Sequence, residues 1–181
     1  TAAGTYLLTG TLSDGQLIVD AGEDEKVQLV LSDASVTCSG SAALYCRSAD
    51  KVFVTTADNT DNELISTGEF VAIDDSNIDG AIYARCDLTL NGAGTLTVRS
   101  ECGHGVVSKD DLAVTSGSYV IDAAKQGLSG KDSVRIAGGT FTITSGTDGI
   151  HAENDDAGKG FIFISGGTIT IASTYDGIDA T

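Results

Sequence analysis

Residues 148–160, DGIHAENDDAGKG, place side chains capable of metal or proton chemistry in a short glycine-rich stretch. Four carboxylates and one Asn fall within positions 148–156, beside His151, one of only two histidines in the chain. Carboxylate and amide oxygens are ligands that Ca²⁺ prefers, and a histidine beside carboxylates can serve as a general base. A solvated acidic loop is the third interpretation. Which of these three interpretations applies depends on the secondary structure that positions the stretch.

Nucleophilic catalysis finds no support in the chain. Neither His104 nor His151 has a Ser or Cys nucleophile in a motif context, so triad chemistry is disfavoured. Both histidines are interpreted as polar surface residues.

Composition limits the classes of protein to consider. The 181 residues suit one domain, which we place at 1–181, and 41% hydrophobic residues argue against disorder. No apolar run approaches the roughly 20 residues that span a bilayer, so no membrane insertion is expected. With 26 acidic and 10 basic residues the net charge is −16, which excludes a nucleic-acid partner. An acidic surface fits a secreted protein, free or attached to the cell surface.

The cysteine pattern predicts disulfides. The four cysteines show no CxxC spacing, and histidines are scarce, so a zinc site is disfavoured. Two disulfides in a secreted protein are expected, with Cys38–Cys46 and Cys86–Cys102 as one possible pairing.

A repeat organises the second half of the chain. Gly105, Gly127 and Gly149 are 22 residues apart, and Gly177 follows 28 residues later, with the six extra residues around DDAGKG. Each unit contains short strand-like runs with alternating apolar and polar residues, as in GGTFTITSG. Such units bury their apolar faces by stacking. The prediction is an all-β fold, a single-stranded right-handed parallel β-helix of about 6–7 rungs, with a β-sandwich as the fallback.

Stacking arranges the repeat into columns. The inward column is aliphatic and is expected to be core: Leu44, Ile82, Val106, Leu128, Ile150 and Ile178. The residue after each of these faces outward, which gives a column of Tyr45, Tyr83, Val107, Ser129, His151 and Asp179. Two positions further on the same face stand Arg47, Arg85, Lys109 and Lys131, followed by Glu153. This basic column is either a charged surface that aids solubility or a track for an anionic polymer. In the second case the rings of Tyr45 and Tyr83 would edge the track.

Acidic residues accompany the basic column. Asp110, Asp132 and Asn154 form one stack, and Asp111, Ser133 and Asp155 are expected to form the next, with Asp148 and Asp176 at the same corner. Stacked carboxylates repel one another unless a cation lies between them. The sequence therefore favours calcium over a merely solvated loop, with these candidate ligands: Asp110, Asp132, Asp148, Glu153, Asn154, Asp155, Asp176 and Asp179.

The whole chain resembles a family of secreted carbohydrate-binding domains from anaerobic bacteria that degrade plant fibre. The resemblance rests on an ordered set of motifs: GTYLLTGTLSDGQLIVDAGEDEKVQLVLSDASVT, ALYCRSADKVFVTT, GVVSKDDLAVT, GLSGKDSVRIAGGTFTIT and DGIHAENDDAGKGFIFISGGTITI. It implies a right-handed β-helix similar to pectate-type lyases, bound calcium, and binding of cellulose and of acidic polysaccharides such as polygalacturonate. The short motifs that the family has at the corners of its β-helix correspond to residues 109–111, 131–133 and 153–155. The cysteines depart from the family pattern.

The last residues, DGIDAT, begin a further repeat unit. Because an uncapped β-helix end exposes strand edges, we expect further C-terminal residues or a capping partner. Other modules of a larger secreted protein are also considered.

Three functions are compared. The first is a non-catalytic, calcium-binding carbohydrate-binding module for plant cell-wall polysaccharide. The alternative is a calcium-dependent polysaccharide lyase in which Lys109 or Lys131 removes the proton at C5 of a uronate. The third is an ice-binding β-helix, suggested by a Thr-x-Thr ladder at residues 140–142 and 168–170. Two regular rungs are too few for it, so the binding module is preferred.

Overall fold

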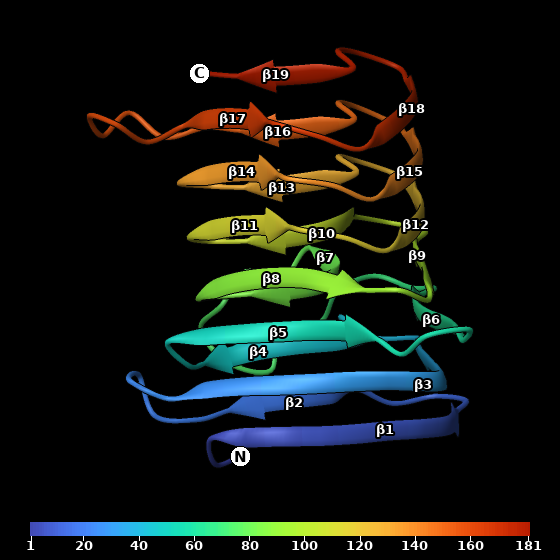
Figure 1. Ribbon diagram of the computed structural model, residues 1–181. Helices are drawn as coiled ribbons and strands as arrows, with labels where there is room; N and C mark the ends of the chain where they lie inside the picture. The colour runs from blue at the N-terminus through green and yellow to red at the C-terminus, as the bar shows by residue number, and fades with distance from the viewer.

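The computed structural model describes residues 1–181 and contains β-strands and turns but no helix, hence none that could cross a membrane. The strands coil into a β-helix whose rungs stack along one axis (Figure 1). The pairings are parallel throughout, which confirms the predicted parallel β-helix and excludes the antiparallel β-sandwich.

The β-helix has three faces, each with one strand per rung. Face 1 is a seven-stranded sheet of β2 (Leu17–Asp20), β4 (Leu44–Ser48), β7 (Gly80–Ala84), β10 (His104–Ser108), β13 (Leu128–Gly130), β16 (Ile150–Ala152) and β19 (Ile178–Ala180). Face 2 contains β5 (Lys51–Thr56), β8 (Asp87–Gly92), β11 (Asp111–Val114), β14 (Ser133–Ile136) and β17 (Phe161–Ile164). Face 3 contains β6 (Asp61–Ser66), β9 (Thr95–Ser100), β12 (Ser118–Ala123), β15 (Thr140–Ser145) and β18 (Thr168–Ser173).

One long strand joins faces 2 and 3. β3 (Lys26–Cys38) pairs with β5 through its first half and with β6 through its second half. The bend lies at Asp33, a non-glycine residue with φ of 53°, and the side chain of Asn62 accepts a hydrogen bond from the amide of Ala34 beside it. β1 (Gly4–Leu12) pairs along β3 and shifts register at Gly10, opposite the bend. Faces 2 and 3 therefore form one continuous sheet at the N-terminal end.

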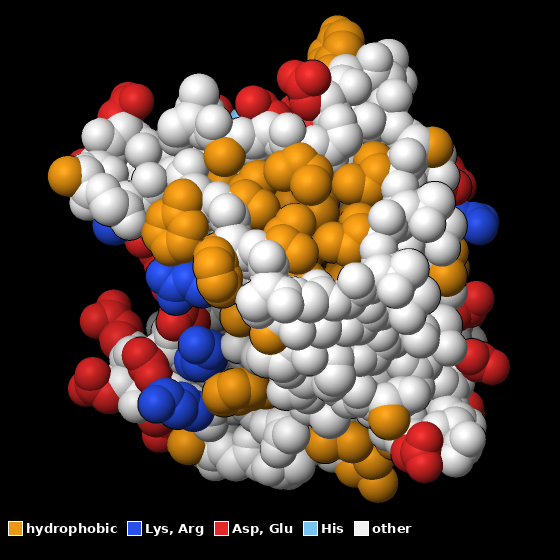
Figure 2. Space-filling model, turned by 45° about the horizontal axis from the view of Figure 1, so that its top comes forward, with side chains coloured by type: hydrophobic (Ala, Val, Ile, Leu, Met, Phe, Trp, Pro, Cys, Tyr) orange, Lys and Arg blue, Asp and Glu red, His pale blue; other side chains and the backbone are white.

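The predicted aliphatic ladder lines the core behind face 1. Strand register aligns Leu17, Leu44, Ile82, Val106, Leu128, Ile150 and Ile178 as direct neighbours. The five from Leu44 to Ile150 have no exposed surface, while Ile178 on the last rung is 49% exposed. Figure 2 shows hydrophobic side chains as a patch at this end of the molecule. Burial of this column supplies part of the hydrophobic stabilisation of the stack.

The 22-residue glycine period marks the tightest contact between rungs. A Cβ atom on Gly127 would lie 2.6 Å from the carbonyl oxygen of Gly149 and 2.5 Å from a methyl group of Ile143. Gly105 meets the carbonyl oxygen of Gly127 at the same distance. Only glycine fits such an approach, so the period seen in the sequence reflects backbone packing.

Face 3 carries the threonine ladder considered for ice binding. Its register aligns Thr97, Val120, Thr142 and Thr170 on the outward side. Val120 is exposed in the middle of the column and interrupts it. The threonines therefore form no continuous array along the face.

Two insertions leave the regular rungs. Residues 67–79 connect β6 to β7, and residues 153–160 connect β16 to β17 and extend away from the body (Figure 1). Because of the second insertion, Ser133 pairs with Phe161. The expected continuation of the Asp111–Ser133 column at Asp155 is therefore wrong, and Asp155 lies exposed in the loop.

The expected disulfides are absent. All four cysteines are free thiols, and Cys38, Cys46 and Cys86 are buried, while Cys102 is exposed. The three buried thiols belong to the main hydrophobic core and act there as small apolar side chains. The proposed pairing of Cys86 with Cys102 joins a core position to a surface one, and the structure does not form it.

Candidate functional site

The outward side of face 1 changes from apolar to polar along the axis. Register aligns Tyr45, Tyr83, Val107, Ser129, His151 and Asp179, as the repeat predicted, and Ile18 precedes them in the same column. The polar end of this column belongs to the C-terminal rungs, so candidate chemistry concentrates there.

Tyr45 and Tyr83 do not edge a binding track, contrary to the expectation from sequence. Tyr45 has no exposed surface and Tyr83 is 3% exposed, because the 67–79 insertion packs Ile78 and Phe70 against them. The Tyr45 hydroxyl donates a hydrogen bond of 2.8 Å to the carboxylate of Asp74 within that insertion. Burial raises the pKa of Tyr83 to about 12. Both rings are therefore core residues that cannot stack on a sugar.

The basic column exists, but its members differ in their partners. The backbone amides of Arg85, Lys109 and Lys131 each donate a hydrogen bond to a carbonyl of the preceding rung, which keeps these residues in register. Arg47 is held by the carboxylates of Asp74, at 3.1 Å, and Asp20, at 3.4 Å. Arg85, Lys109 and Lys131 form no ion pair. Their charges are free to meet a ligand.

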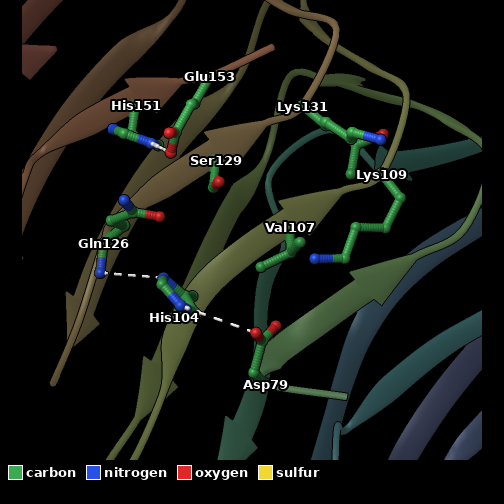
Figure 3. A pocket seen from close by; sticks show the side chains of 10 residues that line it. Asp79, His104, Val107, Lys109, Gln126, Ser129, Lys131, His151 and Glu153 are labelled. Carbon is green, nitrogen blue, oxygen red and sulfur yellow. Dashed lines mark hydrogen bonds and ion pairs between the residues drawn. The ribbon is translucent and has the colours of Figure 1, made fainter. Parts of the chain in front are cut away.

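Lys109 and Lys131 line an open polar pocket of about 200 Å³ on face 1 (Figure 3). Three of its lining residues stand at or just before the starts of the strands, and three stand just after the strand ends, so the lining extends along the length of these short strands. The former are Asp79, His104 and Gln126, and the latter are Lys109, Lys131 and Glu153. Lys109 Nζ lies 5.4 Å from the centre of the Tyr83 ring, a cation–π contact that orients it. A second depression of about 390 Å³ lies along the same column at Arg47 and Arg85.

His104 is neutral in this pocket at neutral pH. Its Nδ1 accepts a hydrogen bond of 3.2 Å from the amide of Gln126, so Nε2 carries the proton. That Nε2 lies 3.9 Å from a carboxylate oxygen of Asp79. Burial lowers the pKa of His104 to about 4, and this effect outweighs the opposing charge of Asp79. His104 therefore offers the pocket a hydrogen-bond donor and no general base.

The acidic stack follows the face 1 strands, at the turn into face 2. The amide of Asp132 donates to the carbonyl of Asp110, and the Asn154 side chain donates a hydrogen bond of 2.6 Å to the Asp132 carboxylate. Burial, and then the charges of Asp132 and Asp87, raise the pKa of Asp110. The 153–160 insertion brings Lys159 back to this stack, with its Nζ 2.8 Å from Asp132. Part of the repulsion is therefore relieved by a cation of the chain itself.

A second acidic group gathers around His151 at the other end of the strands. His151 Nδ1 lies 3.1 Å from an Asp179 carboxylate oxygen and 3.7 Å from one of Asp148, and its Nε2 lies 3.4 Å from Glu153. The amide of Asp176 donates to the other oxygen of Asp148. Because Asp148 and Asp176 precede face 1 strands while Asp132 and Asn154 follow them, the single corner expected from sequence is wrong. The candidate ligands form two groups.

Comparison with known proteins identifies the family of the chain. A family described as carbohydrate-binding domain-containing protein matches residues 1–181. The chain belongs to this family. The domain is 40% identical over 125 residues to a carbohydrate-binding domain-containing protein of Acetivibrio thermocellus, a match that covers 68% of the domain and 44% of that relative. The domain thus spans less than half the length of this curated relative.

A solved structure agrees with the fold of the carbohydrate-binding domain. The polysaccharide lyase-like protein from C. thermocellum, studied as a gadolinium derivative, superposes with a TM-score of 0.93 at 38% identity. The match covers 98% of the domain and 73% of that chain. The β-helix of the domain is thus similar to that of a polysaccharide lyase-like protein over nearly its whole length.

Several residues of the site in the carbohydrate-binding domain were missed by sequence reasoning. His104 and His151 were interpreted as polar surface residues, yet both line the pocket of Lys109 and Lys131. The outward column already placed His151 beside Ser129, which was a usable signal. Asp79 and Lys159 come from the two insertions, for which the repeat offers no register.

Proposed function

We propose that the domain is a non-catalytic module that binds an acidic polysaccharide of the plant cell wall, such as polygalacturonate, in the face 1 pocket. The observation that carries the proposal is the pair Lys109 and Lys131. They stand on successive rungs, line one pocket and lack a carboxylate partner in a protein of net charge −16. Unpaired cations one rung apart suit a polymer whose carboxylates repeat.

The burial of the tyrosines favours an acidic glycan over cellulose. A flat cellulose surface is best met by a row of exposed aromatic rings, and the two rings on this face are buried. The uronate carboxylates of a pectic polymer would accept charge-assisted hydrogen bonds from the lysines, while the neutral His104 could donate to a hydroxyl or carboxylate. We propose that a domain with a ligand of this kind acts outside the cell.

Calcium is part of the proposal, and the stack of Asp110, Asp132 and Asn154 fits it chemically. Carboxylate and amide oxygens on successive rungs are suitable ligands for a hard cation. Burial, and then the charges of Asp132 and Asp87, raise the pKa of Asp110, and a bound cation would offset both effects. Bound there, Ca²⁺ would replace the Lys159 ammonium as the counter-charge and could also bind a uronate carboxylate.

Affinity electrophoresis in gels that contain polygalacturonate tests the proposal, with calcium and with chelator. Lys131→Gln and Lys109→Gln should each weaken retardation about tenfold, because a charge-assisted hydrogen bond contributes about 1.5 kcal/mol or more. The matched control is Lys26→Gln, since Lys26 is an exposed lysine paired with Asp50 outside the pocket. No retardation of the unmodified domain, or an equal loss in the control, would overturn the proposal. Unchanged retardation in chelator would remove calcium from it.

A β-eliminating lyase is the second candidate, supported by the two free lysines in one pocket. Either could remove the C5 proton of a uronate while a cation neutralises the sugar carboxylate. Incubation with polygalacturonate and calcium, followed by the absorbance of the unsaturated product, decides between the candidates. A calcium-dependent signal that disappears in Lys131→Ala would replace the binding-only function with a lyase.

A further inference from the structure

The group around His151 is a compact set of mixed nitrogen and oxygen donors. Asp148 lies in the turn before β16, His151 points outward from β16, and Asp179 is its register partner on β19. One potential ligand atom from each residue lies within 4.8 Å of the other two. The residues come from two adjacent rungs, and the pairing of β16 with β19 already holds them close together.

The distances in this group match the size of a small tetrahedral cation. Ligand atoms about 2.0–2.2 Å from zinc, at tetrahedral angles, lie about 3.3–3.6 Å from one another. The separations from His151 Nδ1 are 3.1 Å to Asp179 and 3.7 Å to Asp148, on either side of that range. These two separations therefore require adjustments of a few tenths of an ångström, and the Asp148 and Asp179 oxygens lie within 4.8 Å of each other.

The charges of the group are unbalanced without a cation. The side chains of Asp148 and His151 are 13% and 14% exposed, and that of Asp179 is 37% exposed. No Lys or Arg pairs with either carboxylate, in contrast to Asp132, which has Lys159. The Asp148 carboxylate, which is largely removed from water, calls for a counter-charge.

The surroundings of the group resemble the outer shell of a metal site. The second ring nitrogen of His151 lies 3.4 Å from the Glu153 carboxylate, so the ring is held between a carboxylate and the candidate metal position. Metal-binding histidines usually donate their other N–H to such a carboxylate, which fixes the tautomer and strengthens the ligand. The amide of Asp176 likewise orients Asp148 through its second oxygen.

We propose that Asp148, His151 and Asp179 bind a divalent first-row transition metal such as Zn²⁺, at a site separate from the oxygen-only stack of Asp110 and Asp132. An imidazole nitrogen is a good ligand for zinc, cobalt or nickel, whereas calcium takes oxygen ligands. Three protein ligands leave a coordination position open. His151 and Glu153 also line the pocket of Lys109 and Lys131, whereas Asp148 and Asp179 do not.

Titration of the tag-free protein with Co²⁺, followed by visible absorption, tests this site directly. Co²⁺ serves as a spectroscopic substitute for Zn²⁺, and no glycan is present, so failure of the proposed function leaves the result intact. We expect saturable binding of one Co²⁺, displacement by Zn²⁺, and no displacement by millimolar Ca²⁺. Absence of saturable binding, or displacement by calcium instead of zinc, would overturn the proposal.

Variants assign the ligands. His151→Gln and Asp179→Asn should each weaken Co²⁺ binding at least tenfold, and Glu153→Gln about tenfold through the orientation of the ring. His104→Gln is the matched control, because it removes the other histidine of the same pocket and should leave the Co²⁺ spectrum and affinity unchanged. Circular dichroism of each variant confirms folding, and Asp179 on the last strand offers a substitution outside the buried core. Equal losses in His104→Gln and His151→Gln would reject the assignment.

Discussion

The ammonium group of Lys159 lies 2.8 Å from the Asp132 carboxylate, although the insertion places the two residues on different rungs. Hydrogen bonding to Asp132 raises the pKa of Lys159. The side chain therefore acts as an internal counter-ion for the acidic stack, in the position where a calcium ion would be expected to act.

Lys159→Gln should strengthen calcium binding several-fold, because the ion would no longer displace an ammonium group. In chelator the same variant should melt at a lower temperature than the parent, since the repulsion between Asp110 and Asp132 is then unrelieved. Calorimetric titration with Ca²⁺ and melting curves in chelator measure the two effects. Weaker calcium binding in the variant would contradict this account of Lys159.

The lowered pKa of His104 predicts that the folded domain loses stability as the pH falls. Its pKa is lowered from an unfolded value of about 6.5 to about 4, so the unfolded chain binds a proton more readily between these values. Stability should fall from pH 6.5 towards pH 4, by about 2 kcal/mol at pH 5. Burial is the main cause, the charges of Lys125, Lys109 and His151 add to it, and Asp79 opposes it.

Urea unfolding at pH 7 and pH 5 measures this dependence. His104→Gln should reduce the difference between the two pH values, because the substituted residue does not titrate. A parent protein and variant with the same pH dependence would show that other groups cause the loss.

Substitution of Tyr45 tests whether the rings of Tyr45 and Tyr83 are buried. Tyr45→Phe should destabilise the fold by about 1–2 kcal/mol, because Asp74 and Ser76 lose a hydrogen-bond partner at 2.8 and 2.9 Å. Glycan binding should not change, since the ring cannot reach a ligand. Tyr175→Phe, at a ring 71% exposed, is the control and should alter neither property. Weaker glycan binding at equal stability would show that the Tyr45 hydroxyl contacts the ligand.

The thiols test the absence of disulfides. One cysteine, Cys102, should react rapidly with a thiol reagent in the native protein, and four should react after denaturation without reductant. Burial raises the pKa of Cys86 to about 12 and that of Cys46 well above its usual value, which slows their reaction further. Cys102→Ser should abolish the rapid phase. Fewer than four reactive thiols in the denatured protein would indicate a disulfide.

The regular part of the fold was predictable because one physical cause produces it. Gly105, Gly127 and Gly149 are spaced by backbone contact between rungs, and the aliphatic residue after each glycine faces the core. Once the rungs were aligned on these glycines, the inward column and the order of the outward column followed, and strand register confirms both.

The site was less predictable because insertions form much of it. Residues 67–79 bury Tyr45 and Tyr83, and nothing in the repeat indicates which rung such a segment will cover. Lys159 likewise reaches Asp132 from an insertion of irregular length. The placement of Asp148 at the same corner as Asp132 failed for a simpler reason: the two lie at opposite ends of strands only three residues long.

The close glycine contacts fix more than the packing of the core. Since adjacent rungs already touch at Gly127 and Gly149, their separation is held to that of paired strands, about 4.8 Å. Side chains in an outward column are therefore evenly spaced along the axis of the β-helix. Substitution can change the chemical group at each position of the column, but the backbone sets the spacing between positions.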